Sequence, residues 1–271
     1  MTVEIKQSPF VYENNPTLNP VLLPIFSCVD LSTLGTIRQV CQQWKKTADS
    51  PNLEKNIIYN TVAFNCQKWR NYGGDEIKSC DNEESELKSL PDNMSEIFKN
   101  YFPGKKMKDC LLVRIPNGTS LLTLKRIMQK FLQKKGSFSE AFHHFISPVD
   151  NATGKSYWIL MSKQVLDVTR GKHFKQQVEL ANNLGYDAPP KAVEAVACIF
   201  SEFLSTGNRL FNSDSIRCEE RAKLKHTSGQ VCVGGFDWDG LNVGPGGDGG
   251  DCFDSGNVGI VGMKRFFKHI T

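Results

Sequence analysis

The chain has 271 residues, of which 39% are hydrophobic and 23% are charged, so its composition is that of an ordinary folded protein and excludes wholesale disorder. The formal net charge is +4, from 33 basic and 29 acidic side chains, and the basic residues are spread along the chain, which argues against a nucleic-acid-binding face. No run approaches the ~18 apolar residues that a membrane helix needs, and the N-terminus shows no basic segment followed by an apolar run, so we expect no cleavable secretory signal.

The nine cysteines do not indicate a disulfide framework, because their number is odd and no C-x-x-C pair occurs. Disulfide frameworks are typical of short secreted chains. Three cysteines lie in apolar runs, where a thiol behaves as a small buried hydrophobe: Cys28, Cys41 and Cys198. We therefore expect a reducing, cytoplasmic working environment, with no bound cofactor.

The first part of the chain divides into a polar leader and a helical module. Residues 1–16 are polar and contain two prolines, so we expect a flexible leader. Residues 17–65 carry apolar side chains at helical spacing in two stripes. The first stripe consists of Val21, Leu22, Ile25, Phe26 and Val29, and the second of Leu34, Ile37, Val40, Cys41 and Trp44. Residues 52–63 are predicted to form a third helix.

Residues 66–107 are predicted to be a linker. The stretch from 71 to 95 is acidic and poor in apolar side chains, which is typical of a solvated spacer. A short helix near residues 84–89 is the one element expected in it.

Residues 108–271 are predicted to form an α+β domain. Short apolar runs bounded by turn residues indicate strands at 110–115, 157–161, 216–220, 230–234, 241–243 and 258–263. Amphipathic patterns predict helices at 120–133, 173–184 and 191–204. Because these elements follow each other without a regular βαβ rhythm, the expected fold class is α+β, with a three-helix module in front of the mixed domain.

The helical module resembles the F-box, a three-helix family. The resemblance rests on the run NPVLLPIFSCVDLSTLGTIRQVCQQWKKTADSPNLEKNI, which matches the family's IF-x-x-L-D followed by L…VC-x-x-W. The family usually opens with Leu-Pro and a nearby Glu, where this chain has Thr17, Leu18 and Pro20. Pro24 also falls in the first helix, at a cost of about 3 kcal/mol in a helix interior but little if the helix begins near Leu22.

The resemblance implies that the module docks on the small helical adaptor of SCF-type cullin–RING ubiquitin ligases. The residues expected to bind this adaptor are Leu22, Ile25, Phe26, Leu34, Val40 and Trp44. The size of the module also indicates a partner, because about 45 residues cannot bury a tryptophan, a phenylalanine and many aliphatic side chains on their own. The remaining apolar surface must be covered by another protein or, alternatively, by the rest of this chain.

The C-terminal part resembles uncharacterised F-box-containing effector proteins of intracellular bacteria. The matching residues are Tyr157 and Trp158, and the stretches 206–211, 217–220 and 233–236. This resemblance implies action in the cytoplasm of a eukaryotic host, after delivery without a cleaved signal. Arg209, Arg217 and Glu219 are candidates for a target-recognition site, or else for structural polar pairs.

Other sites have weaker support in the sequence. The Gly/Asp-rich patch at 246–254 is a single imperfect copy of a calcium-binding turn and is expected to be a plain loop. Cys218, His226 and Cys232 lack the close ligand pairs of a zinc site, and adjacent His143 and His144 point to different faces. We therefore predict that the protein neither binds a metal nor acts as an enzyme. One alternative is a cysteine hydrolase of the ubiquitin pathway. Another is a scaffold protein whose F-box-like helices pack only against the rest of the chain. The basic cluster that includes Lys125, Arg126 and Lys130 is expected to be a solvated helix face.

Overall fold

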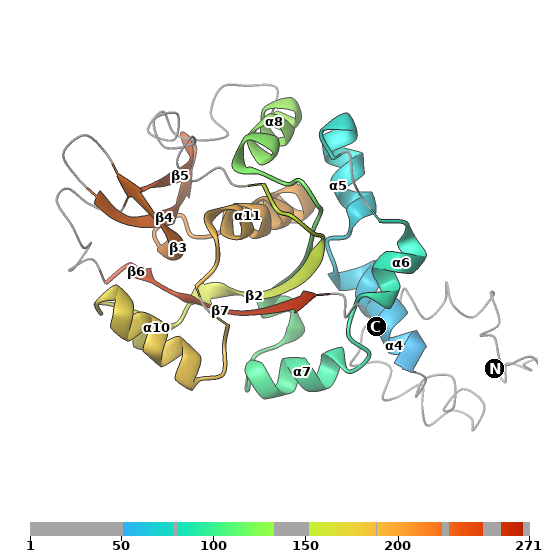
Figure 1. Cartoon of the computed structure of the whole chain (residues 1–271), viewed down its shortest axis with the longest axis horizontal. Coiled ribbons are helices and arrows are strands. Elements are labelled where there is room, and N and C mark those ends of the chain that lie inside the picture. Colours follow the sequence, from blue (N-terminus) through green and yellow to red (C-terminus); the bar gives the residue numbers. More distant parts are fainter. Residues whose placement is uncertain are drawn as a thin grey trace, which may run out of the picture.

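The computed structural model describes residues 51–77, 81–132, 152–187, 189–223, 228–245 and 256–267. They form a mixed α+β fold with two β-sheets and helices packed around them (Figure 1). The predicted α+β class is thus confirmed for this part of the chain. The first two helices predicted for the N-terminal module lie outside the described residues.

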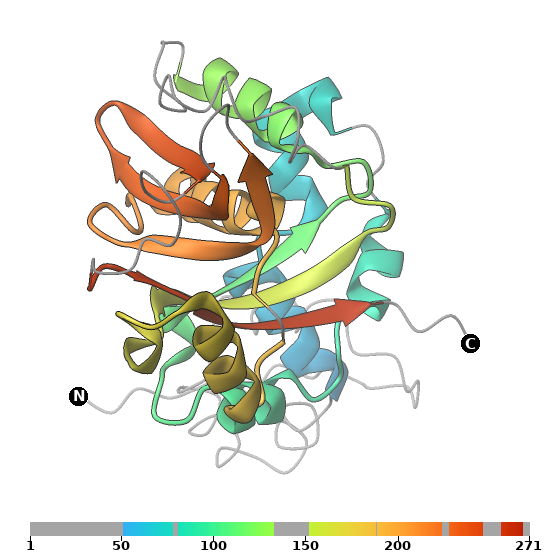
Figure 2. The ribbon, with the colours of Figure 1, turned by 60° about the vertical axis from the view of Figure 1, so that its left-hand side comes forward.

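The first sheet has three antiparallel strands, in the order β1 (Cys110–Ile115), β2 (Tyr157–Val165) and β7 (Val261–Phe267). Figure 2 shows the red β7 beside the yellow β2. The first six residues of β2 are all buried, without the alternation of a half-exposed strand. Such a continuous apolar run is typical of a strand that is covered on both faces.

The second sheet has four strands, in the order β5 (Gly240–Pro245), β4 (Ser228–Asp237), β3 (Ser215–Lys223) and β6 (Val258–Gly259). Strand β3 pairs antiparallel with β4 and parallel with β6. A single residue, Ile260, separates β6 from β7, so the chain passes directly from the second sheet into the first.

Helix α11 (Ala192–Thr206) forms the centre of the main core. It contacts β1 of the first sheet and both β3 and β4 of the second. Most of its side chains are buried, as expected of a helix that is apolar on nearly all sides. The helix ends at Gly207, whose φ of 76° is the left-handed conformation that glycine adopts without strain.

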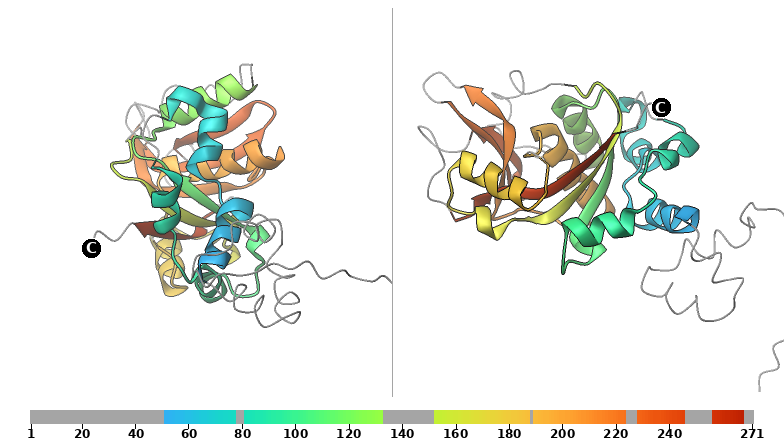
Figure 3. Two further views of the ribbon diagram at one scale, coloured as in Figure 1. Left: turned by 90° about the vertical axis from the view of Figure 1, so that its right-hand side faces the viewer. Right: turned by 60° about the horizontal axis from the view of Figure 1, so that its bottom comes forward.

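Helices from earlier in the chain cover the opposite face of the first sheet. They are η1 (Ile58–Val62, a π-helix), α6 (Glu83–Lys88) and α7 (Met94–Tyr101). Leu112 and Trp158 of the sheet pack there against Tyr59, Leu90 and Phe98. Figure 3 shows this group of blue to green helices on the side of the first sheet that faces away from the second sheet.

The prediction that residues 66–107 form a linker is not what the structure shows. The described residues of this segment include α5 (Cys66–Gly73), α6 and α7. Five of its large apolar side chains are buried in the body of the protein: Trp69, Leu90, Met94, Phe98 and Phe102. These side chains are few and stand alone among acidic and polar neighbours, so average composition hides them. The segment therefore covers the face of the first sheet that is opposite α11.

The remaining helices agree with the sequence patterns to within a few residues. They are α8 (Leu121–Leu132) and α10 (Phe174–Asn183), with short 3-10 turns η2 (Gly74–Glu76), η3 (Met107–Asp109) and η5 (Asp167–Thr169). Strand β1 has its predicted bounds, whereas β2 is longer than predicted because Val165 pairs with Val261 after a register shift.

The helix predicted over 52–63 is an α-helix, α4 (Pro51–Ile57), that runs on into the π-helix η1. Two polar contacts tie α4 to the start of α7. The Glu54 carboxylate accepts a hydrogen bond from the backbone N–H of Ser95 at 3.1 Å, and Lys55 Nζ lies 2.8 Å from Asp92 Oδ1. Because Asn93, the N-cap of α7, makes no capping bond with its own side chain, Glu54 supplies that function from another helix.

Replacing Glu54 with Ala should lower the free energy of unfolding by about 1 kcal/mol, because the backbone N–H of Ser95 in the first turn of α7 loses its acceptor. Urea denaturation followed by circular dichroism measures this change. The control is Glu84→Ala, which removes an exposed carboxylate paired only with Lys88 on the surface of α6 and should leave the midpoint unchanged. Equal midpoints for Glu54→Ala and wild type would show that the bond to Ser95 does not stabilise α7.

Candidate functional site

The six residues predicted to bind the ligase adaptor lie outside the described residues. They are Leu22, Ile25, Phe26, Leu34, Val40 and Trp44. The third predicted helix of the module is described as α4, and its Leu53 and Ile57 are fully buried within this chain. The apolar side chains of this last helix of the module are therefore not exposed to a partner.

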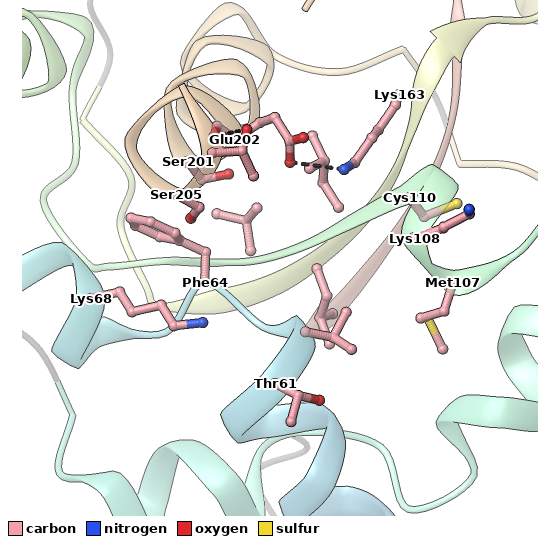
Figure 4. Close-up of a pocket in the computed structure, with 15 residues that line it drawn as sticks. Thr61, Phe64, Lys68, Met107, Lys108, Cys110, Lys163, Ser201, Glu202 and Ser205 are labelled. Atoms are coloured by element: carbon pink, nitrogen blue, oxygen red, sulfur yellow. Dashed lines mark hydrogen bonds and ion pairs between the residues drawn. The ribbon is translucent and has the colours of Figure 1, made fainter. Parts of the chain in front are cut away.

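A second candidate site is an open cavity of ≈ 510 Å³ at the outer edge of β1. We call it the β1-edge groove (Figure 4). Its floor is formed by residues 110–113 of β1. Its sides are formed by Thr61, Val62, Phe64 and Lys68, by Met107 and Lys108, by Lys163, and by Ser201, Glu202, Ser205 and Thr206 of α11.

The edge of β1 in this groove is only partly paired. Phe64 makes one parallel bridge to it: Phe64 N–H donates to Leu112 O at 2.7 Å, and Arg114 N–H donates to Phe64 O at 2.9 Å. Since Leu112 and Arg114 thus turn their backbone groups away from β2, Leu111 and Val113 must face β2. This alternation directs the N–H of Leu112 and the C=O of Cys110 into the groove, while the N–H of Cys110 donates to Met107 O.

The groove exists because the chain that leaves η1 does not reach the edge of β1 until Phe64. The π-helix holds residues up to Val62, and Ala63 then becomes extended, with φ −68° and ψ 139°. Asn65 already caps α5, its side chain accepting from Lys68 N at 3.0 Å. Only Phe64 is left to pair with β1, so the edge before it remains open.

Lysine side chains give the groove a positive charge. Lys163 Nζ lies 2.8 Å from the carboxylate of Glu202, so this pair is neutral overall. Lys68 Nζ donates to the carbonyl of Ala63 at 2.6 Å, and burial lowers the pKa of its ammonium group. Lys108 is exposed on the rim. Figure 4 shows the Lys68 side chain extending beside Phe64 toward the end of η1.

A buried carboxylate fixes the wall formed by residues 59–66. Glu86 is 1% exposed, and it accepts hydrogen bonds from Cys66 N at 2.9 Å and from the Tyr59 hydroxyl at 3.0 Å. Arg114 of β1 lies close enough to favour the ionised form. Burial is nevertheless the larger effect and raises the pKa of Glu86 above its ordinary value.

Arg114 links this network to the sheet. Its side chain is 1% exposed, donates to Ser89 Oγ at 3.0 Å and pairs with Asp81. Its guanidinium also lies 5.5 Å from the ring centre of Trp158, whose indole N–H donates to the same Ser89 Oγ at 3.1 Å. The helices from 81 to 101 are thereby joined to β1 and β2 by polar as well as apolar contacts.

The recognition residues proposed from sequence do not line the groove. Arg217 is buried and donates to Lys172 O and to Gln177 Oε1, which supports the structural alternative for this residue. Arg209 lies over the rings of Phe203 and Phe236, with its guanidinium 5.7 Å and 5.5 Å from their centres. The backbone N–H of Glu219 donates to Pro190 O.

Residues that could bind a metal are not gathered in the described part of the chain. No group of three or more His, Cys, Asp or Glu side chains has metal-binding geometry there. Cys218 lies on β3 and Cys232 on β4, whereas the other metal candidates, His143, His144, His226 and the patch 246–254, fall outside the described residues. None of the helices in the described ranges has the length and apolar content needed to cross a bilayer.

One surface prediction is wrong. Lys125 was expected on a solvated helix face, but it is 8% exposed, and burial lowers the pKa of its ammonium group. Its neighbours Arg126 and Lys130 do lie at the surface, where both pair with Glu76. Lys125 follows Leu121 by four residues and precedes Met128 by three, so it lies on the same face of α8 as these two buried side chains.

Sequence reasoning missed the β1-edge groove. It assigned residues 61–68 to the end of the helical module and its linker, and 107–108 to the end of that linker. A contact made by the single residue Phe64 leaves no periodic pattern that could have predicted it.

Comparison with known protein families identifies an F-box domain at residues 19–56. This finding confirms the F-box predicted from the spaced apolar residues and Trp44. No curated protein and no solved structure matches the chain. The resemblance of the C-terminal part to bacterial effector proteins therefore stays a prediction.

Replacing Glu86 with Gln should change how stability depends on pH. A carboxyl whose pKa is raised in the folded state stabilises the protein below its ordinary pKa, and this contribution is lost as the pH rises through the folded value. Glutamine does not titrate, so the free energy of unfolding of the variant should improve relative to wild type as the pH rises from the ordinary carboxyl pKa, about 4, to neutral pH. Urea denaturation across that range measures the difference.

The matched control for this experiment is Glu179→Gln, which removes one exposed carboxylate from α10. It separates the effect of the buried site from a general change in net charge. A stability difference between Glu86→Gln and wild type that stays constant with pH would contradict the raised pKa of Glu86.

Proposed function

We propose that this chain is an F-box adaptor whose F-box domain, residues 19–56, docks on Skp1, the small helical adaptor of SCF-type cullin–RING ubiquitin ligases. The described α+β body would then present a target protein to the ligase. The observation that carries this proposal is the F-box match itself. The ligase supplies the ubiquitin transfer, so the proposed role needs no catalytic group in this chain.

The way α4 joins the body supports the presenting role. The F-box match ends within α4, whose Leu53 and Ile57 are buried and whose Glu54 and Lys55 are tied to α7. The helix then continues through η1 to the bridge between Phe64 and β1. A target bound to the body would therefore be held in a constant position relative to the end of the F-box.

The effector role is the finer part of the proposal. The resemblance of residues 206–211, 217–220 and 233–236 to effector proteins supports it. In this version the chain acts in the cytoplasm of a host cell and directs the host's own ubiquitin ligase toward a protein chosen by the α+β body.

The scaffold alternative is that the F-box helices pack entirely against this chain. The burial of Leu53 and Ile57 favours it for α4. Burial of α4 alone does not cover the apolar stripes that contain Phe26 and Trp44. The adaptor proposal predicts that these stripes bind Skp1, and the scaffold alternative predicts that they do not.

The hydrolase alternative needs a thiolate nucleophile. Burial raises the pKa of Cys110 to about 12, and it raises the pKa values of Cys198 and Cys218 as well. A thiol that resists ionisation is a poor nucleophile at neutral pH. These three cysteines therefore act as buried apolar side chains.

Purified Skp1 should be retained by the full-length chain in a pull-down, and Trp44→Ser and Phe26→Ser should weaken binding. Loss of an aromatic side chain at the centre of an interface costs roughly thirtyfold in affinity. The matched control is Trp238→Ser, because Trp238 is 79% exposed on the turn between β4 and β5. Retention of Skp1 by all three variants would contradict the docking roles of Phe26 and Trp44, and no retention by the wild-type chain would support the scaffold alternative.

A ubiquitin probe that carries a thiol-reactive group at its C-terminus should leave the native full-length chain unlabelled, because the proposed role needs no nucleophilic cysteine and the thiols of Cys110, Cys198 and Cys218 are buried and protonated. Mass spectrometry of the intact protein detects the adduct. Labelling of the same chain after unfolding in urea shows that its thiols are chemically intact. An adduct that forms on the native chain would point to an active-site cysteine and contradict the proposal.

A further inference from the structure

Trp238 is held in solvent at the tip of the hairpin that joins β4 to β5. Its side chain is 79% exposed, whereas the other two tryptophans in the described ranges, Trp69 and Trp158, are fully buried. Tryptophan carries a large apolar surface and is highly buried on average. An indole left in water at the tip of a turn is typical of a residue that anchors an interface.

The turn itself does not require a tryptophan. Asp237 and Gly240 pair across it and occupy its first and fourth positions, where aspartate and glycine are favoured. Asp237 Oδ1 accepts a hydrogen bond from the backbone N–H of Asp239 at 2.8 Å, and Gly240 has a φ of 116°, which suits glycine. The second position, held by Trp238, favours proline. The backbone of the turn is therefore fixed by its other residues, and the indole plays no part in it.

The base of the hairpin keeps Trp238 in a defined position. Phe236, two residues before it, is 1% exposed, and its ring centre lies 5.2 Å from that of Phe203 on α11. The Arg209 guanidinium lies 5.5 Å from the same Phe236 ring. An anchor on a fixed backbone loses less conformational entropy when it binds, so this hairpin presents Trp238 in a preorganised way.

Two carboxylates flank the exposed indole. Asp237 and Asp239 are both exposed, and neither forms an ion pair with another described residue. A surface that receives this tip therefore needs an apolar pocket for the indole and uncompensated cations beside the pocket.

The β1-edge groove of the same chain offers such a pocket. Its cavity of ≈ 510 Å³ falls within the range of about 300–1,000 Å³ that is usual for small-molecule pockets, so it has space for an indole ring. Its apolar lining includes Val62, Phe64 and Met107. Aromatic rings and thioether sulfur atoms both make favourable contacts with an indole.

Lysines give the groove the charge that the tip requires. Lys68 and Lys108 line it, and neither has a carboxylate partner among the described residues, whereas Lys163 is compensated by Glu202. Figure 4 shows Phe64 at one end of this lining and Lys108 with Lys163 at the other. Two uncompensated lysines thus match the two uncompensated aspartates beside the indole.

Both surfaces belong to the same end of α11. Ser205 and Thr206, the last two residues of this helix, line the groove. Phe203, slightly earlier in the helix, packs on Phe236 at the base of the hairpin that carries Trp238. Two complementary surfaces that lie near each other on one molecule can be joined by a two-fold axis, so that each copy both gives and receives the same contact.

We infer that two copies of this chain form a symmetric dimer in which Trp238 of each copy enters the β1-edge groove of the other and Asp239 pairs with Lys108. Asp239 is assigned to this pair because Asp237 Oδ1 is already used within the turn. The inference goes beyond the proposed function, since neither surface contains a residue of the F-box match at 19–56.

Sedimentation velocity of the full-length chain tests the dimer. The weight-average mass should rise with concentration from 30.4 kDa toward twice that value. Trp238→Ser should weaken the dimer roughly thirtyfold, because an aromatic anchor is lost from each contact. The matched control is Leu184→Ser, which removes another exposed apolar side chain, 52% exposed at the end of α10, and should leave the dimer unchanged.

A charge exchange tests how the two surfaces meet. Asp239→Lys and Lys108→Glu should each weaken the dimer about tenfold, because a like-charge pair replaces an ion pair in both contacts. An equimolar mixture of the two variants should associate about as strongly as wild type, since opposite charges then meet in both contacts of the mixed dimer. Lys175→Glu, at an exposed lysine of α10, is the control and should leave the dimer unchanged.

Three outcomes would overturn the inference. They are a wild-type chain that stays monomeric up to about 100 μM, a Trp238→Ser variant that associates as well as wild type, and a mixture that associates no better than either of its parts. The second outcome would show that another surface, such as the apolar stripes of the F-box, holds the copies together. A monomeric chain that retains Skp1 refutes only this inference, and a dimeric chain that does not retain Skp1 refutes only the proposed function.

Discussion

The structure depends on the burial of both faces of the sheet formed by β1, β2 and β7. An apolar sheet needs a cover on each side, and the C-terminal half supplies only one, the helix α11. Residues 58–102 supply the other, with Tyr59, Leu90 and Phe98 packed on Trp158. The described N-terminal helices and the later α+β elements are therefore parts of one folded body.

This shared sheet also explains the polar features of the site. Covering the second face buries Arg114 of β1, so the covering helices bring Asp81 and Ser89 to pair with it, and Glu86 binds the chain from Tyr59 to Cys66. Among the described residues, only Phe64 of this covering segment pairs its backbone with the edge of β1. The strong anchoring of this wall and the open strand edge beside it are thus two results of one chain path.

Most elements of the C-terminal part could be predicted because their signals are local. The run CLLVRI is closed by Pro116, Asn117 and Gly118, and β1 has the predicted bounds. Residues 66–107 could not be assigned correctly, since Trp69, Leu90 and Phe98 are single apolar positions in an acidic segment and their burial depends on a distant sheet. The groove depends on where Phe64 meets β1, a tertiary contact with no periodic signature.

The direct continuation of α4 through η1 to the β1 edge has a consequence for which lysines would receive ubiquitin. A rigid connection between the F-box and the α+β body would fix the distance between the ligase and the substrate that the body binds. On the proposed function, a substrate is then selected twice, first by binding to the body and then by geometry. Only lysine amines at the right distance from the ligase would meet the enzyme that carries ubiquitin. Substrates that the body binds in the same way but that differ in shape would be modified at different places, or not at all.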